Sequence, residues 1–459
     1  MTTKRRSSAA LIDGPVHSLL IKMTIPMIFG MLSVIGFNLI DTYFVSHLGT
    51  TELAAMSFTF PVVMVIASIS LGLGVGASAT ISRAIGEGDH DRVRRLTTDS
   101  LFLSFLIVAL FVSAGLMLLE PTFTLLGASG RSLTLVIDYM LIWYPGVLFL
   151  IIPMVGNNAI RATGDTKTAS AIMLIGMSLN LLLDPLFIFG LGPFPRLELK
   201  GAAIATVIAR AVTFTLAMYV LSRRKGMLTL NYPGMVQIIA SWRQILYISL
   251  PAAASNIIIP ISIAIITRMI ASYGPEAVAA FGVASRIDMF ALIIVMALHA
   301  SLAPFVGQNM GAGRFDRVRL GIRYSQRFAL LWGFFVCIVL LFGGPFIASL
   351  FSDNEVVIST IIVYFWIVPI GYGMQGILRL SCQALNIMRK PVHSALLGSM
   401  QAFVLYIPLA YLGSRTIGLD GIFGAATISN VLAGMAAYLL LKRVVSAIEA
   451  AYEEASLSR

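Results

Sequence analysis

The chain has 459 residues, of which 58% are hydrophobic and 12% charged, and its mean hydropathy is +0.91. This composition excludes the two or three soluble domains that such a length would otherwise suggest, and it indicates a polytopic membrane protein. The net charge of +11 could indicate nucleic-acid binding, but the basic residues concentrate in alternate loops, so we expect membrane lipid as a partner and no nucleic acid.

Apolar segments long enough to cross a membrane recur about every 30–35 residues along the chain. We therefore predict an all-α integral membrane protein with twelve transmembrane helices. The predicted spans lie near residues 17–46, 53–82, 97–119, 133–156, 169–192, 201–222, 244–270, 278–305, 322–347, 357–381, 392–413 and 421–441.

Lysine and arginine residues gather before the first span and after the even-numbered spans. Examples are Lys4 and Arg5 at the start, Arg92 and Arg94 after the second span, and Lys442 after the last. Because loops rich in Lys and Arg stay on the inner side of the membrane, we expect both termini to be cytoplasmic. The expected location is a bacterial inner membrane.

The sequence repeats itself at a shift of about 225 residues, which pairs Pro26 with Pro251 and segment 91–94 with segment 316–319. Each copy holds six spans, so both enter the membrane in the same orientation, and we expect two six-helix bundles related by a pseudo-two-fold axis along the membrane normal. The predicted parts are an N-terminal lobe (1–222), a cytoplasmic linker (223–243), a C-terminal lobe (244–441) and a cytoplasmic tail (442–459).

The two copies differ where a charge lies inside the membrane. Asp41 is opposite Ile266, and Asp184 is opposite Ile407 after the shift drifts to 223. A carboxylate in a span costs on the order of 2.5–3.5 kcal/mol on insertion scales, so it usually faces a cavity or a partner. This asymmetry predicts that the coupling chemistry lies in the first lobe.

The two carboxylates are also matched in depth. Asp41 lies 19 residues beyond Lys22 and Asp184 lies 17 beyond Lys167, which places both roughly 26–29 Å from the inner basic edge. Asn180 lies one turn before Asp184 on the same helix face. We interpret Asp41, Asn180 and Asp184 as a cation or proton site, because burial and a second nearby carboxylate both favour protonation. Stabilisation of the bundle by hydrogen bonds is the alternative.

Three further positions are candidates for a role in the site or in its movement. Tyr139 enters from the outer end of the fourth span and reaches a similar depth, while Asn157 at the inner end of that span either caps a helix or lines a passage. Pro26 removes a backbone hydrogen bond from the helix that carries Asp41, so it could act as a hinge or simply bend the fold.

No nucleophile–base motif and no metal motif occurs in the sequence. We therefore expect a secondary transporter without a cofactor.

Segments 25–28, 38–42 and 161–167, together with the duplicated twelve-span plan, resemble the multidrug and toxic compound extrusion (MATE) family. The resemblance covers essentially the whole chain. It points to the DinF-like branch, because acidic residues lie in the first lobe and none lies in spans seven and ten, where the NorM branch has them.

The resemblance implies that Asp41 is the essential protonation site, that Asn180 and Asp184 form its network, and that the first helix bends at Pro26. It also implies that Phe37 and Tyr139 border the substrate cavity, with Asn157 and Asn180. Two positions depart from the family's pattern. Phe37 stands where a tyrosine is often found, and Ala202 stands where a threonine can contribute oxygen, although Thr206 one turn on could substitute. A loss of oxygen donors weakens a sodium site more than a proton site, so we expect proton coupling.

The predicted function is a monomeric antiporter that exports amphipathic, cationic or planar drugs in exchange for protons. A Na⁺-coupled antiporter using Asp41, Asn180 and Asp184 is one alternative. A flippase for lipid-linked precursors is another, but it should carry several basic residues in its cavity, and we identified chiefly Arg286 within a span, with Arg268 near an end. A membrane prenyl transferase would need paired Asp-rich motifs, which are not found.

Overall fold

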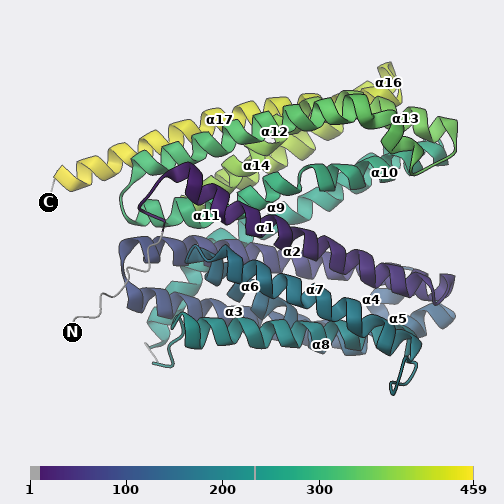
Figure 1. The fold of residues 1–459 in the computed structure, drawn as a ribbon, viewed down its shortest axis with the longest axis horizontal. Helices are drawn as coiled ribbons and strands as arrows, with labels where there is room; N and C mark the ends of the chain where they lie inside the picture. Colours follow the sequence, from purple (N-terminus) through teal and green to yellow (C-terminus); the bar gives the residue numbers. More distant parts are fainter. Residues whose placement is uncertain (1–10, 232–233, 458–459) are drawn as a thin grey trace. The chain divides into compact units, whose positions relative to one another are not determined.

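The computed structural model describes residues 11–231 and 234–457, and the regular structure in these ranges is helical (Figure 1). Within them, 12 helical stretches are long and apolar enough to cross a membrane. They run from Val16–Ser46 to Leu419–Glu454 and match the predicted spans in order. The predicted all-α membrane architecture is confirmed.

The described residues fall into two compact units: 25–253, and 11–24 with 254–457. The division lies within two helices, α1 (Val16–Ser46) and α9 (Met235–Ala271). The other helices of the first unit are α2 (Thr50–Glu87), α3 (His90–Met117), α4 (Leu119–Leu125), α5 (Gly130–Gly146), α6 (Leu148–Ala162), α7 (Thr166–Phe189), α8 (Glu198–Tyr219) and a π-helical turn (Val220–Arg224).

Besides its parts of α1 and α9, the second unit contains the elements from α10 to the long helix α17, which continues into the predicted tail. Its elements are α10 (Pro275–Ala291), α11 (Ile293–Gly311), α12 (Phe315–Ser349), α13 (Glu355–Ile367), a 3₁₀ turn (Val368–Gly371), α14 (Tyr372–Ile387), α15 (Pro391–Ser399), a π-helical segment (Met400–Tyr406), α16 (Ile407–Thr416) and α17 (Leu419–Leu457).

Two boundaries differ from the sequence-based expectation. Helix α9 starts at Met235, inside the predicted linker 223–243, because an apolar stretch directly follows Gly234 and extends the helix. The predicted eighth span, 278–305, breaks at Leu292 between α10 and α11. There the Trp332 indole donates a hydrogen bond to the carbonyl of Ala291 at 2.8 Å, and a side chain that takes a backbone carbonyl interrupts the helical ladder.

Helix α1 packs along α7 in a parallel register within the first unit. A Cβ on Gly30 would lie 2.9 Å from Ser170 Oγ, and one on Gly36 would lie 3.0 Å from Met177 Sδ. Further along both helices, the rings of Phe44 and Phe189 are 6.1 Å apart. The contacting residue numbers rise together on the two helices, so the stretch of α1 from Gly30 to Phe44 lies at the level of α7 from Ser170 to Phe189.

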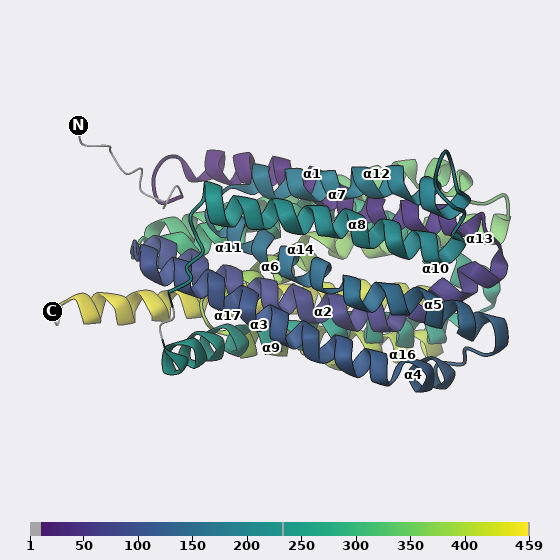
Figure 2. The same cartoon turned by 90° about the horizontal axis from the view of Figure 1, so that it is seen from below.

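Helices α7 and α8 pack side by side in the opposite sense (Figure 2). A Cβ on Gly176 would lie 2.8 Å from Thr213 Cγ2, and one on Gly201 would lie 2.3 Å from the carbonyl oxygen of Phe187. The glycines allow this close backbone approach. The register places the middle of α8, including Thr206 and Arg210, at the level of the C-terminal half of α7.

The connection 161–167, one of the segments that resembles the MATE family, has a local structural role. Gly164 has φ +88, which favours glycine, and Asp165 caps α7 by accepting from the amide of Thr168 at 3.0 Å. Lys225 Nζ lies 2.8 Å from Asp165 Oδ2. Partial burial by itself raises the pKa of Asp165, but hydrogen bonds from Lys225 and Thr168 outweigh it and hold that pKa below its ordinary value.

We expect Asp165→Ala to lower the free energy of unfolding by about 1–2 kcal/mol, because both the helix cap and the ion pair are lost. The folded-state pKa of Asp165 is depressed, so its contribution is present near neutral pH and is lost as the pH falls through the folded value. Thermal unfolding of the purified protein at neutral and acid pH measures both effects. Asp353→Ala, at an exposed loop aspartate, is the control, and equal melting temperatures for the two variants would contradict the assignment.

Candidate functional site

The packing of α1 on α7 brings the two predicted carboxylates to one level of the first unit. Asp41 follows the Gly36 contact and precedes the Phe44 contact, and Asp184 occupies the equivalent stretch of α7. The two charges are close enough to interact electrostatically. Asp184 is fully buried and Asp41 is 7% exposed.

Asn180 and Asp184 are joined directly, one turn apart on α7. The Asn180 side-chain amide donates to Asp184 Oδ1 at 2.9 Å, and Asn180 is also fully buried. The structure thus brings these two predicted site residues into direct contact. The interaction uses one of the two side-chain N–H donors of Asn180, and the second Asp184 oxygen has no hydrogen-bond partner among the described residues.

The cluster contains buried oxygen atoms that accept no hydrogen bond from the described protein groups. They are Asp41 Oδ1, Asn180 Oδ1, Asp184 Oδ2 and Thr206 Oγ1. A buried acceptor without a donor costs roughly 1–3 kcal/mol. Such a group of acceptors is suited to take up a proton or a cation.

Tyr139 is 4% exposed, lies on α5, and interacts electrostatically with both Asp41 and Asp184. Its position therefore agrees with the sequence-based expectation that it reaches the depth of the two acids. Asn157 lies elsewhere: its side-chain amide donates to the carbonyl of Ala169 at 3.2 Å and ties α6 to the start of α7. Pro26 lies within α1, which continues as a helix through it.

Arg210, which lies in the sixth predicted span and on α8, is a site residue that was not predicted from the sequence. Its charge interacts with Asp41 and Tyr139, and its Cζ atom lies 5.8 Å from the ring centroids of both Phe37 and Trp143. Its Nη1 atom is buried without a hydrogen-bond partner in the described part of the chain. The signal was present, because an arginine inside an apolar span is as unusual as an aspartate.

A partly buried carboxylate also occurs in the second unit, but both of its oxygens accept hydrogen bonds. Asp288 on α10 accepts hydrogen bonds from the hydroxyl groups of Tyr364 and Tyr372, one on each oxygen. Arg286 is exposed and forms no ion pair with Asp288 among the described residues. Across residues 11–231 and 234–457, no group of three or more His, Cys, Asp and Glu side chains could hold a metal ion.

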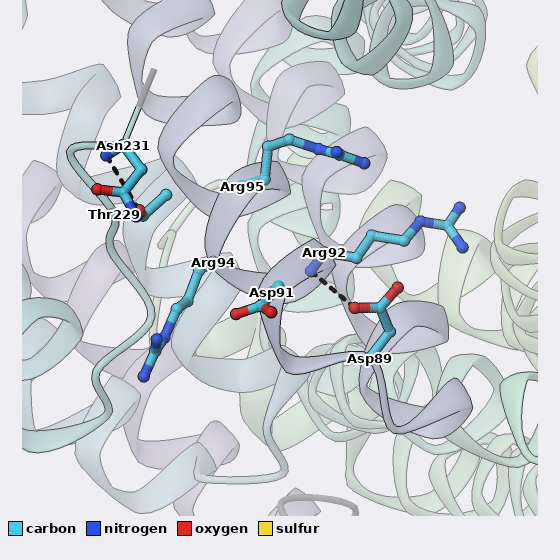
Figure 3. Close-up of a pocket in the computed structure, with 7 residues that line it drawn as sticks. All are labelled: Asp89, Asp91, Arg92, Arg94, Arg95, Thr229 and Asn231. Atoms are coloured by element: carbon cyan, nitrogen blue, oxygen red, sulfur yellow. Dashed lines mark hydrogen bonds between the residues drawn. The ribbon is translucent and has the colours of Figure 1, made fainter. Parts of the chain in front are cut away.

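A cavity of about 410 Å³ lies beside the start of α3, and it is lined by Asp89, Asp91, Arg92, Arg94, Arg95, Thr229 and Asn231. Figure 3 shows the side chains of Arg92 and Arg95 extending toward one side and that of Arg94 pointing away from them. Arg94 donates to the carbonyl of Gly226 at 2.9 Å, and Arg95 donates to Gln237 at 3.0 Å. These arginines hold the connection between α8 and α9, and they do not converge on a common ligand position.

The MatE family profile matches the chain twice, over residues 26–186 and 251–412. A protein named FAD transporter from Shewanella oneidensis is 40% identical over 96% of this chain and 97% of its own length. The multidrug export protein MepA from Staphylococcus haemolyticus is 24% identical over 94% of each chain. The crystal structure of the Vibrio cholerae MATE transporter VcmN in the bent form superposes with a TM-score of 0.90 and 31% identity, covering 97% of this chain and 100% of that one.

These similarities extend over both copies of the internal repeat and nearly the whole chain. They confirm the duplicated twelve-span fold, and they confirm that the protein is a transporter and not an enzyme. The chain belongs to the MATE family of multi-pass membrane transporters.

Proposed function

We propose that the protein is a proton-coupled antiporter that exports amphipathic aromatic compounds, with Asp41 as its protonation site. The observation that carries this proposal is the buried group of acceptors around Asp41 and Asp184, which lack donors in the first unit. The satisfied Asp288 of the second unit offers no such place for a proton. The multidrug export relative supports the class of substrate.

Charge explains how a proton and a cationic substrate would exclude each other. With both acids ionised, Asp41, Asp184 and Arg210 together carry one net negative charge. A cationic aromatic compound is attracted to this charge, and protonation of Asp41 removes it. Proton and substrate then favour different states of the same site, which is the thermodynamic requirement for exchange.

Arg210 also favours a proton over Na⁺ as the coupling ion. A sodium ion at Asp41 would keep its positive charge beside the guanidinium group, whereas a proton neutralises the carboxylate and leaves no second cation. Neither Phe37 nor Ala202 supplies a side-chain oxygen. A Na⁺ site made from Asp41, Asn180, Asp184 and Thr206 remains the alternative that transport measurements must distinguish.

The close contacts between α1 and α7 suggest how protonation changes the structure. Gly30 and Gly36 hold the middle of α1 against α7, while Pro26 removes one hydrogen bond on the N-terminal side of these contacts. Neutralising Asp41 weakens its attraction to Arg210 on α8. We propose that α1 then bends at Pro26, and that movement of the two repeated lobes exposes the site to alternate sides of the membrane.

We expect Asp41→Asn to reduce dye transport driven by a pH gradient by at least about tenfold, because the exchangeable proton is lost. Uptake of a cationic dye into inside-out membrane vesicles is measured with ΔpH and ΔNa⁺ imposed separately. Asp288→Asn, at a partly buried aspartate of the second unit, is the matched control and should keep most of the activity. Full transport by Asp41→Asn, or wild-type transport that follows only ΔNa⁺, would overturn the proposal.

Export of FAD is a second candidate function, favoured by the relative that is 40% identical and named FAD transporter. The phosphates of FAD are anionic, so an inside-negative membrane potential itself drives the molecule outward, by about 2.3 kcal/mol per charge per 100 mV. We expect FAD-loaded liposomes to release FAD faster when they contain the protein. A release rate equal to that of FAD-loaded liposomes without the protein would exclude this function.

A further inference from the structure

Arg210 contributes its charge to the proposed protonation mechanism, which leaves its hydrogen-bonding groups unused. A basic side chain within a span is costly, and the guanidinium group has five N–H donors to satisfy. No ion pair joins Arg210 to Asp41 or Asp184 within the described residues, and Nη1 is buried without an acceptor. The protein groups around it therefore leave part of its binding capacity unused.

Two aromatic rings lie next to the guanidinium group of Arg210. Phe37 comes from α1 and Trp143 from α5, and the Arg210 Cζ atom lies 5.8 Å from the centroid of each ring. Trp143 is almost completely buried. A guanidinium group binds phosphate through paired hydrogen bonds, and aromatic rings next to it can stack on a flat heterocycle. Together these groups match a ligand that combines a flat ring with a phosphate.

We infer that Arg210, Phe37 and Trp143 form a subsite for anionic planar aromatic substrates such as flavin nucleotides, with Arg210 binding the phosphate. This inference rests on the proposed export function and names a substrate class for its site. It also explains how one cluster can serve ligands of opposite charge: the carboxylates attract cations, and the guanidinium group attracts anions.

The charges of the site give the affinities for anionic and cationic ligands opposite dependences on pH. The titratable and charged groups around Asp41 are Arg210 from α8, Asp184 from α7 and Tyr139 from α5. When Asp41 is ionised, its charge is attracted to Arg210 and repels a phosphate. When Asp41 is protonated, Arg210 is free to bind the phosphate, while a cationic ligand loses its attraction. Anion affinity should therefore rise as the pH falls, and cation affinity should decrease.

The test compares binding of FMN, riboflavin and a cationic dye to the purified full-length protein. FMN and riboflavin share the flat ring and differ by one phosphate. We expect wild type to bind FMN more tightly than riboflavin. Arg210→Gln should lower the affinity for FMN by at least about tenfold, which is the loss typical of a charge-assisted hydrogen bond. Riboflavin binding should change little. Arg286→Gln, at an exposed arginine, is the control and should match wild type.

Equal losses for FMN and riboflavin, or no loss for either, would overturn the subsite. A second test uses the wild-type protein alone, so its result cannot be affected by a variant that fails to fold. FAD keeps its pyrophosphate charge between about pH 6 and pH 8, so its affinity should increase severalfold toward the lower pH while that of the dye decreases. Parallel pH dependences would also overturn the inference.

The subsite and the proposed antiport function can be tested separately. If Arg210→Gln loses FMN binding while wild type transports dye under ΔpH, the subsite is supported and proton coupling stands. If wild type transports no dye under ΔpH yet shows the FMN preference that Arg210→Gln abolishes, the subsite holds and the antiport proposal fails. Arg210→Lys keeps the charge without the planar group and should retain part of the preference.

Discussion

The structure of the first unit depends on how charge is compensated inside an apolar helix bundle. Two carboxylates, Asp41 and Asp184, and one guanidinium group, Arg210, come from three different helices. Each alone would be expensive in a membrane, and together they offset most of each other's charge. The glycine contacts of α1 with α7 and of α7 with α8 hold these groups at one level. The remaining unsatisfied oxygens then define what the site can accept.

The second unit shows that this unsatisfied state is not a general property of the repeated plan. At the shift of 225 residues, Tyr139 is the counterpart of Tyr364, and each tyrosine is buried near a carboxylate. In the second unit the hydroxyl of Tyr364, with that of Tyr372, saturates Asp288. In the first unit Asp41 keeps an oxygen without a partner. The same scaffold thus carries one closed polar network and one that can still take up a proton.

Much of this arrangement could be predicted from the sequence, because hydropathy, loop charge and the repeat identify spans and their order. The pairing of Asn180 with Asp184 followed from helical spacing alone. The place of Arg210 beside Asp41 could not be predicted, because spacing along one helix does not reveal which residues of another helix lie beside it. The break at Leu292 depends on Trp332, which is distant in sequence, and no local signal could have shown it.

The central claim is that substrate and proton compete at Asp41. Calorimetric titration of the purified protein with a cationic dye, in buffers of different ionisation enthalpy, measures the protons exchanged on binding most directly. We expect dye binding to release protons from the wild-type protein, and Asp41→Asn to bind the dye without releasing them. Dye binding without proton release by wild type, or equal release by Asp41→Asn, would contradict it.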